Sequence, residues 1–260
     1  DLPGAQFFDP DTMKAQINNE GWKKAVQDYV DIFHYCPQGS EHFGILDTRE
    51  VFISGKAAMT LDWGDTGPLA ADPKRSCVVD KVGYFVLPGT DTVWNYKKHT
   101  WEKQERPHKV PFLAFGGWVG GVPKNSRHKE AAWDFIVWFG NPENSLHDVV
   151  TSDTGINPYR YSHFMNIDAW TNLLSRQSAS EYLDVIRVSL ESRNIALDLR
   201  IPGFNEYTTA FEKQLFRAVK GEASVQEAMD EAAAEWEAIT DRMGREKQRT
   251  LYRSSMGLSK

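Results

Sequence analysis

The sequence predicts a mixed α/β protein whose C-terminal part is wholly helical. From Trp22 to Phe33, apolar residues recur at the spacing of one face of an α-helix. Three apolar runs bounded by glycine or proline are typical of short β-strands, and the last is expected to form two strands broken by a glycine pair. These runs are Ala57 to Trp63, Lys81 to Leu87 and Val110 to Val122. The polar stretch from Thr90 to Lys109 is expected to be an irregular surface insertion.

Local signals mark the ends of several predicted helices. Thr48 is placed to cap a short helix that carries Val51 and Phe52, and Gly55 is its expected stop. Further helices are predicted to start near Asn18-Asn19 and at Ser126, Asn141-Pro142, Asp168, Ser178 (with Glu181 in a capping box), Asn205, and Ser224 (with Glu227 in a second box). Gly140 and Gly221 are the expected stops of the helices before them.

The composition is that of a globular protein with no nucleic-acid or membrane-spanning character. Apolar residues make up 41% and charged residues 25% of 260 residues, which is enough for one large domain or two smaller ones. The net charge of −6, with no basic cluster before the last helix, disfavours nucleic acid as a partner. No apolar run approaches the roughly 18 residues that span a bilayer. The polar start at Asp1 indicates either a cytoplasmic protein or one supplied without its leader.

Cysteine and histidine usage indicates no metal or cofactor. Cys36 and Cys77 are far apart in the sequence, and both a disulfide and two separate buried thiols remain open. The glycines around Gly117 lack the Lys-Ser/Thr of a phosphate-binding loop. Seven histidines are scattered without metal-ligand spacing: His34, His42, His99, His108, His128, His147 and His163.

Seven motifs, in this order, resemble the bacterial extracellular solute-binding proteins of ABC importers, and within them the sugar-binding group that includes maltose-binding protein. The motifs are FISGKAAMTLDWGD, VGYFVLPG, GGWVGGV, RHKEAAWDFIVWF, TGINPYR, LRIPGFNEY and AVKGEASVQEAMDEA. They cover nearly the whole chain from Phe7 onwards. The resemblance implies a periplasmic protein of the periplasmic-binding-protein type II fold, in which two α/β lobes joined by a hinge hold the ligand between them.

The resemblance also implies how the segments divide between lobes. Residues 1–62 would form the first part of the C-terminal lobe, and residues 63–125 the hinge crossing and a segment of the N-terminal lobe. Residues 126–260 would complete the C-terminal lobe. Family members carry much further chain before the point that matches residue 1, so the N-terminal part of the fold is expected to be absent. Strands without neighbours leave open edges, which predicts an incomplete cleft, self-association of the truncated chain, or both.

The candidate ligand-binding residues combine aromatic faces with polar side chains, as a sugar with an apolar C–H face and a rim of hydroxyls requires. Trp63 and Trp118 are expected to stack on the sugar, or else to pack in a core. Asp65 would accept hydroxyl hydrogen bonds or stabilise a turn, and Gly117 would present its backbone N–H. Asn157 and Arg160 belong, by the resemblance, to a loop that faces the cleft, and a structural ion pair is the alternative there. Arg200, Glu206 and Tyr207 would form a second polar group in the C-terminal lobe, and Arg200 alternatively bridges to Glu206.

Three functions follow from these residues. The first is the solute-binding component of an ABC importer, which binds a sugar or polyol and delivers it to a membrane permease without chemistry. The second is a glycoside hydrolase, which needs two carboxylates about 5 to 9.5 Å apart, and Asp65 with Glu206 is the pair to test. The third is an interaction domain that has lost its ligand. The sequence supplies no nucleophile for an enzyme, and it does not identify the solute.

Overall fold

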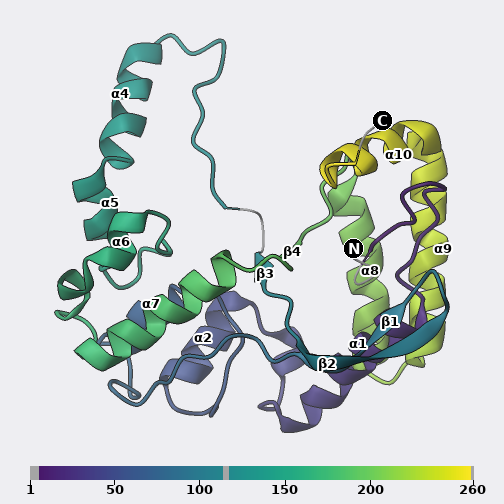
Figure 1. Cartoon of the computed structure of the whole chain (residues 1–260), viewed down its shortest axis with the longest axis horizontal. Coiled ribbons are helices and arrows are strands. Elements are labelled where there is room, and N and C mark those ends of the chain that lie inside the picture. The colour runs from purple at the N-terminus through teal and green to yellow at the C-terminus, as the bar shows by residue number, and fades with distance from the viewer. Residues whose placement is uncertain (1–5, 114–116, 259–260) are drawn as a thin grey trace. The chain divides into compact units, whose positions relative to one another are not determined.

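The computed structural model describes residues 6–113 and 117–258 (Figure 1). The chain divides into two compact units. The first unit comprises residues 1–42, 89–109 and 196–260, and the second comprises residues 43–88 and 110–195. These boundaries differ from the predicted segment ends at residues 62 and 125, and the assignment of segments to lobes stays a prediction.

The first unit is mainly helical, with one β-hairpin. In chain order it contains α1 (Glu20–Ile32), the 3-10 helices η1 (Phe33–Tyr35) and η2 (Ser40–His42), strands β1 (Thr90–Asn95), β2 (Thr100–His108) and β4 (Ala196–Leu197), and helices α8 (Phe204–Val219), α9 (Val225–Met243) and α10 (Arg245–Ser255). The side chain of Asn19 accepts the Trp22 N–H at 3.1 Å, so α1 begins where the sequence predicts.

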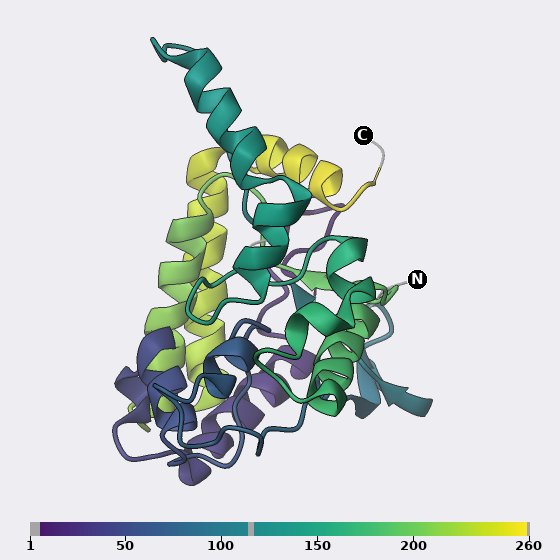
Figure 2. The ribbon, with the colours of Figure 1, turned by 90° about the vertical axis from the view of Figure 1, so that its left-hand side faces the viewer.

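Aromatic side chains fill the core of this unit, where α8 and α9 lie side by side (Figures 1 and 2). Phe8, from the N-terminal segment, stacks on Trp236 of α9 with ring centroids 5.1 Å apart. The Trp236 indole N–H donates to the Tyr207 carbonyl of α8 at 2.8 Å, which satisfies a buried donor and fixes the two helices against each other.

Strands β1 and β2 form an antiparallel hairpin, so the prediction of an irregular insertion at residues 90–109 is wrong. Trp94 faces Trp101 across the pair, with their rings 5.5 Å apart. The turn is closed by Asn95, whose side-chain oxygen accepts the N–H groups of Lys97 and Lys98 at 3.1 Å each. The polar composition concealed a cross-strand aromatic pair, which is what stabilises an isolated ribbon.

The second unit is built from short helices and long connections. It contains α2 (Ile45–Ile53), α3 (Thr66–Ala71), strand β3 (Phe112–Leu113), α4 (Lys129–Phe139), α5 (Pro142–Val149), α6 (Tyr161–Met165), the 3-10 helix η4 (Ile167–Trp170) and α7 (Arg176–Leu190). Tyr182 of α7 is its central buried side chain, 5.2 Å from the Trp170 ring and 5.3 Å from the Tyr84 ring. Burial raises the pKa of Tyr84 to about 12.

Two of the predicted strands are wrong, and only a fragment of the third is found. Residues 57–63 and 81–87 belong to no strand in the described structure, and Met59 is 86% exposed. Of the run at residues 110–122, Phe112–Leu113 forms β3, and residues 114–116 lie outside the described part. An apolar run becomes a strand only when a neighbouring strand takes up its backbone hydrogen bonds.

Several helix starts also differ from the prediction. α2 begins after Gly44 rather than at Thr48, and α7 begins after Ser175 rather than at Ser178. Ser126 lies three residues before α4, and near Asp168 the chain forms the 3-10 helix η4 instead of an α-helix. The predictions at Asn141-Pro142, Gly140, Gly221 and the Ser224–Glu227 capping box are confirmed.

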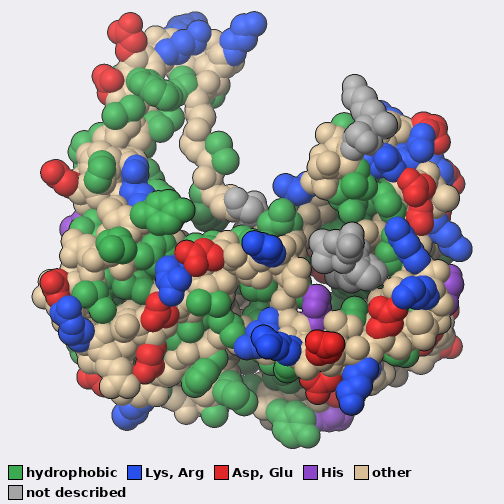
Figure 3. Space-filling view, viewed as in Figure 1, with side chains coloured by type: hydrophobic (Ala, Val, Ile, Leu, Met, Phe, Trp, Pro, Cys, Tyr) green, Lys and Arg blue, Asp and Glu red, His purple; other side chains and the backbone are tan. Residues whose placement is uncertain are grey.

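Helix α4 projects from the rest of the second unit, and none of its residues is buried (Figures 1 and 2). Its side chains are nevertheless mostly apolar, and Trp133, Phe135 and Trp138 are each 58 to 61% exposed. Figure 3 shows apolar side chains uncovered along this helix, at the upper left. A helix that is apolar on most sides is normally part of a core.

No helix within residues 6–113 and 117–258 is long and apolar enough to cross a membrane. The same residues contain no group of three or more His, Cys, Asp or Glu side chains arranged to hold a metal ion. Cys36 and Cys77 both carry free thiols, so the disulfide alternative is not realised in this structure.

Candidate functional site

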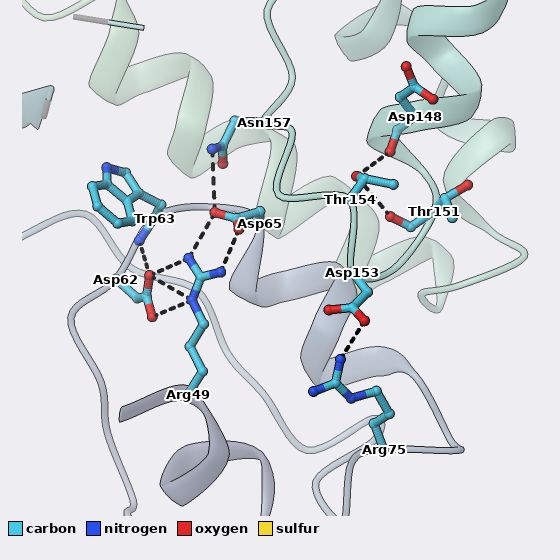
Figure 4. Close-up of polar contacts among 10 residues, drawn as sticks. All are labelled: Arg49, Asp62, Trp63, Asp65, Arg75, Asp148, Thr151, Asp153, Thr154 and Asn157. Atoms are coloured by element: carbon cyan, nitrogen blue, oxygen red, sulfur yellow. Dashed lines mark hydrogen bonds and ion pairs between the residues drawn. The ribbon is translucent and has the colours of Figure 1, made fainter. Parts of the chain in front are cut away.

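The predicted central motif forms a tight corner that leads into α3 (Figure 4). The Trp63 carbonyl accepts the Thr66 N–H at 3.2 Å, and the Gly64 carbonyl accepts the Gly67 N–H at 2.9 Å. The chain therefore turns from extended to helical at these residues. The turn places the Trp63 side chain and the carboxylates on either side of it at the start of α3.

Arg49, on α2, pairs with both carboxylates of this corner (Figure 4). Its Nη2 lies 2.8 Å from Asp62 Oδ1, and its Nη1 lies 2.7 Å from Asp65 Oδ2. The three side chains are only 8 to 12% exposed. The hydrogen bond to Asp62 raises the pKa of the Arg49 guanidinium, against the opposing effect of burial, so the cation stays charged. We call Arg49, Asp62 and Asp65 the corner triad.

Asn157 joins the corner triad from the loop between α5 and α6. Its Nδ2 donates to Asp65 Oδ1 at 3.4 Å. The loop is tied to α5 by Thr154, whose hydroxyl donates to the Asp148 carbonyl at 2.7 Å. Gly64 is required for this approach, because a Cβ there would lie 2.6 Å from the Asn157 side-chain oxygen. The loop and the corner are thus fitted to each other.

Trp63 is half-buried, and its backbone N–H donates to Asp62 Oδ1 at 2.6 Å. The predicted residues Trp63, Asp65 and Asn157 therefore lie together in the second unit (Figure 4). The structure supports a structural role for Asp65, which already accepts two hydrogen bonds from Arg49 and one from Asn157. An ionised carboxylate has about four acceptor positions, so one remains for a ligand hydroxyl.

Gly117 and Trp118 lie on an exposed loop of the second unit. Trp118 is 90% exposed, and a Cβ on Gly117 would have no described atom within 4 Å. Gly117 has φ +98°, a conformation that glycine adopts readily.

Arg160 follows Asn157 along the same loop and serves the local fold. Its guanidinium donates to the Gly140 carbonyl at the end of α4 and lies over the Tyr159 ring, 5.5 Å from the ring centroid. His163, at 0% exposed, holds the same loop, because its Nδ1 accepts the Tyr159 N–H at 3.4 Å. Burial lowers the pKa of the His163 imidazole.

The three remaining candidates lie in the first unit. Arg200 donates to the Ser255 carbonyl at the end of α10, and Glu206 pairs with Arg242 of α9. The alternative pairing of Arg200 with Glu206 is therefore not the one formed.

Tyr207 is fully buried in the core, where its hydroxyl lies 2.9 Å from Thr240 Oγ1. These contacts give the three first-unit residues structural roles in this structure.

Two members of the corner triad, Arg49 and Asp62, were missed by the sequence reasoning. The sequence does contain a pattern that points to these two residues. The DWGD motif places two carboxylates three residues apart at the end of an apolar run, and buried carboxylates require a cation. Arg49 is the basic residue of the helix that precedes the motif. Its pairing depends on how α2 packs, which sequence spacing does not specify.

A family model described as bacterial extracellular solute-binding protein matches residues 3–145, more than half of the chain. The chain belongs to this family.

A protein of similar sequence supports this assignment. The mannitol-binding protein of Pseudomonas aeruginosa is 29% identical over 136 residues, which are 52% of this chain and 27% of that protein.

Solved structures show the fold, which is that of the periplasmic-binding-protein type II proteins. Maltose-bound MalE3 of T. maritima matches 91% of this chain and 54% of its own, with a TM-score of 0.70 at 20% identity. An ABC transporter solute-binding protein of Agrobacterium vitis with bound D-mannitol matches 93% and 56%, with a TM-score of 0.66 at 24% identity. A third, of Agrobacterium radiobacter in complex with ribitol, matches 90% and 53%, with a TM-score of 0.68 at 23% identity. The chain thus spans little more than half the length of these structures.

Proposed function

We propose that this chain is part of the solute-binding component of an ABC importer, which binds an uncharged sugar or polyol and delivers it to a membrane permease. The observation that carries the proposal is the corner, where the half-buried Trp63 stands between carboxylates held by Arg49. An indole face beside carboxylate and amide oxygens suits a ligand with C–H faces and many hydroxyls. Relatives named for or bound to mannitol, ribitol and maltose support this ligand class.

In this proposal Trp63 stacks on the solute, and Asp65 and Asn157 accept or donate hydrogen bonds at its hydroxyls. Binding between two lobes, a periplasmic location and the absence of any chemical step complete the proposed function. Gly117, Trp118, Arg160, Arg200, Glu206 and Tyr207 stay predictions as ligand contacts. Arg160, Arg200, Glu206 and Tyr207 make the hydrogen bonds and ion pairs within the protein that are described above.

The test is a thermal-shift and calorimetric titration of the protein with mannitol, ribitol and maltose. A ligand at 100 times its Kd adds about 2.7 kcal/mol to the free energy of unfolding. Trp63→Ala should weaken binding about ten- to hundredfold, because burial of one large aromatic face contributes about 1.5–3 kcal/mol. Trp63→Phe keeps part of the face and should lose less.

Two outcomes would contradict this function. Flat titrations of the full-length protein against a broad sugar panel would favour the ligand-free interaction domain. Turnover of aryl glycosides that is lost in both Asp65→Asn and Glu206→Gln would favour the glycoside hydrolase, since that mechanism needs both carboxylates.

A further inference from the structure

Arg49 connects the two ends of the corner that presents Trp63. Its Nε donates to Asp62 at 3.0 Å, its Nη1 donates to Asp65 at 2.7 Å, and its Nη2 donates to both carboxylates, at 2.8 and 3.1 Å. Asp62 and Asp65 flank the Trp-Gly pair in the sequence. The planar guanidinium therefore fixes the separation of the two residues that bracket Trp63, as a flexible ammonium group does not.

The same contacts reach the backbone of Trp63. Asp62 Oδ1 accepts the Trp63 N–H at 2.6 Å while it accepts Arg49 Nη2 at 2.8 Å. Asp62 is held by Arg49, and Asp62 in turn orients the peptide that carries the indole (Figure 4). On the other side, Gly64 has no room for a Cβ, because Ile186 Cδ1 would lie 2.8 Å from it. The Trp63 peptide is thus restrained from both directions.

Arg49 itself is committed to protein partners. A guanidinium has five N–H donors, and bonds to the two aspartates use all three of its nitrogens. Its side chain is 12% exposed. An arginine so placed acts on the ligand through its neighbours.

We propose that Arg49 is a positioning residue for the solute site, which fixes the Trp63 ring and the free lone pair of Asp65 for the ligand. The ligand in this inference is the one of the proposed function, on which that part rests. The orientation of Trp63 by Arg49 follows from the hydrogen bonds alone. It assigns a role to Arg49, a residue outside the predicted ligand contacts.

The test uses the variant Arg49→Lys, which keeps the positive charge but loses the planar guanidinium and its fixed N–H donors. Two measurements are made on it. The first is calorimetric titration with mannitol, in which the stoichiometry reports the folded fraction and Kd reports the site. We expect Kd to rise about tenfold, with the stoichiometry unchanged. A residue with a purely structural role would lower the stoichiometry or the melting temperature and leave Kd unchanged.

The second measurement needs no ligand. In protein labelled with 5-fluorotryptophan, the Trp63 resonance is identified by its loss in Trp63→Phe. Arg49→Lys should shift or broaden this resonance and leave those of Trp170 and Trp236 in place. The matched control is Arg75→Lys, because Arg75 pairs with Asp153 at 2.6 Å in the same unit but 41% exposed, and it should alter neither measurement.

The outcomes separate the two proposals. If the wild-type protein binds no polyol, the proposed function fails, while the fluorine spectra still test Arg49. If the Trp63 resonance of Arg49→Lys is that of the wild type, or the Kd is unchanged where mannitol binds, the positioning role is overturned. If Arg49→Lys does not fold, Asp62→Ala takes its place, since it removes the acceptor of the Trp63 N–H and keeps the pairing of Arg49 with Asp65.

Discussion

At the scale of single residues, the corner triad is a buried ion-pair cluster with one cation and two anions. Breaking such a cluster leaves a charge without its partner in a place that water reaches poorly. Asn157 adds a neutral donor to Asp65 at 3.4 Å, which does not replace a charge. The triad should therefore contribute to stability as well as to the arrangement of the site.

Asp65→Ala tests this contribution. Because Arg49 would keep its pairing with Asp62 but lose its two charge-assisted hydrogen bonds to Asp65, we expect the free energy of unfolding to fall by about 2–3 kcal/mol. Urea denaturation followed by circular dichroism measures the change. Asp153→Ala removes the anion of the exposed Arg75 pair and should cost about 0–1 kcal/mol. Equal losses of unfolding free energy in the two variants would show that the triad stabilises the fold no more than an exposed ion pair does.

His163 gives the second unit a pH-dependent stability. Its Nδ1 accepts the Tyr159 N–H, and its Nε2 lies 3.2 Å from Ser145 Oγ, so the neutral ring serves both contacts. Burial, and secondarily the charge of Arg160, lower its pKa from the ordinary value of 6.5. The unfolded chain therefore binds the proton more readily than the folded chain, and the contribution of His163 is complete above pH 6.5.

As the pH falls below 6.5 toward the lower folded pKa, this contribution should be lost and the melting temperature should decrease. Calorimetry between pH 7.5 and about pH 5 measures the decrease, above the range in which carboxylates with ordinary pKa values of about 4 titrate. His163→Gln removes the titrating ring and should flatten the profile over this interval. A profile of unchanged slope in that variant would assign the effect to another group.

At the scale of elements, helix ends are set by contacts within a few residues. At α9 the Ser224 hydroxyl accepts the Glu227 N–H at 3.2 Å, and the Glu227 carboxylate accepts the Ser224 N–H at 2.9 Å. Ser224→Ala should lower the free energy of unfolding by about 1 kcal/mol, and Ser224→Thr should restore most of it, because threonine keeps the acceptor. Urea midpoints of the two variants decide this, and indistinguishable midpoints would contradict the capping role.

The sequence was most informative where structure depends on such neighbours. The starts of α1, α5 and α9 were predicted from Asn19, Asn141-Pro142 and Ser224, since each cap is satisfied within one helical turn. The strand predicted at Ala57 to Trp63 failed because pairing depends on other segments of the chain. The hairpin of β1 and β2 was missed because its register is visible only once Trp94 faces Trp101.

In the candidate site, too, local features were predicted and features that depend on tertiary packing were not. The corner motif directed attention to Trp63 and Asp65, and the resemblance added Asn157, and these three do lie together. Arg49 was not predicted, because its position next to the corner comes from the packing of α2. Tyr207 was expected at a ligand, and its helix instead directs it into a core. Residue type and local spacing indicate chemistry, whereas orientation depends on tertiary contacts.

At the scale of the whole molecule, the exposed apolar surface of α4 should govern behaviour in solution. We expect the chain to bind the dye ANS and to associate as its concentration rises, because uncovered apolar surface contributes about 25 cal/mol per Å² when buried. Sedimentation velocity measures the association. Trp133→Glu combined with Val137→Lys, one helical turn apart on α4, should reduce both effects.

The matched control for this prediction is Val188→Lys on α7, where a single exposed valine is replaced at 49% exposure. It should leave dye binding and association as they are in the wild type. If the wild-type chain sediments as a monomer at every concentration and binds no ANS, then α4 does not mediate self-association.

The two thiols have a practical consequence for observing motion. The chain contains two cysteines, both free, with Cys36 in the first compact unit and Cys77 in the second. A donor dye on one and an acceptor dye on the other would report the separation of the units by energy transfer, without engineered attachment points. A transfer efficiency that changes on addition of mannitol would record a change in the distance between the two dyes, molecule by molecule.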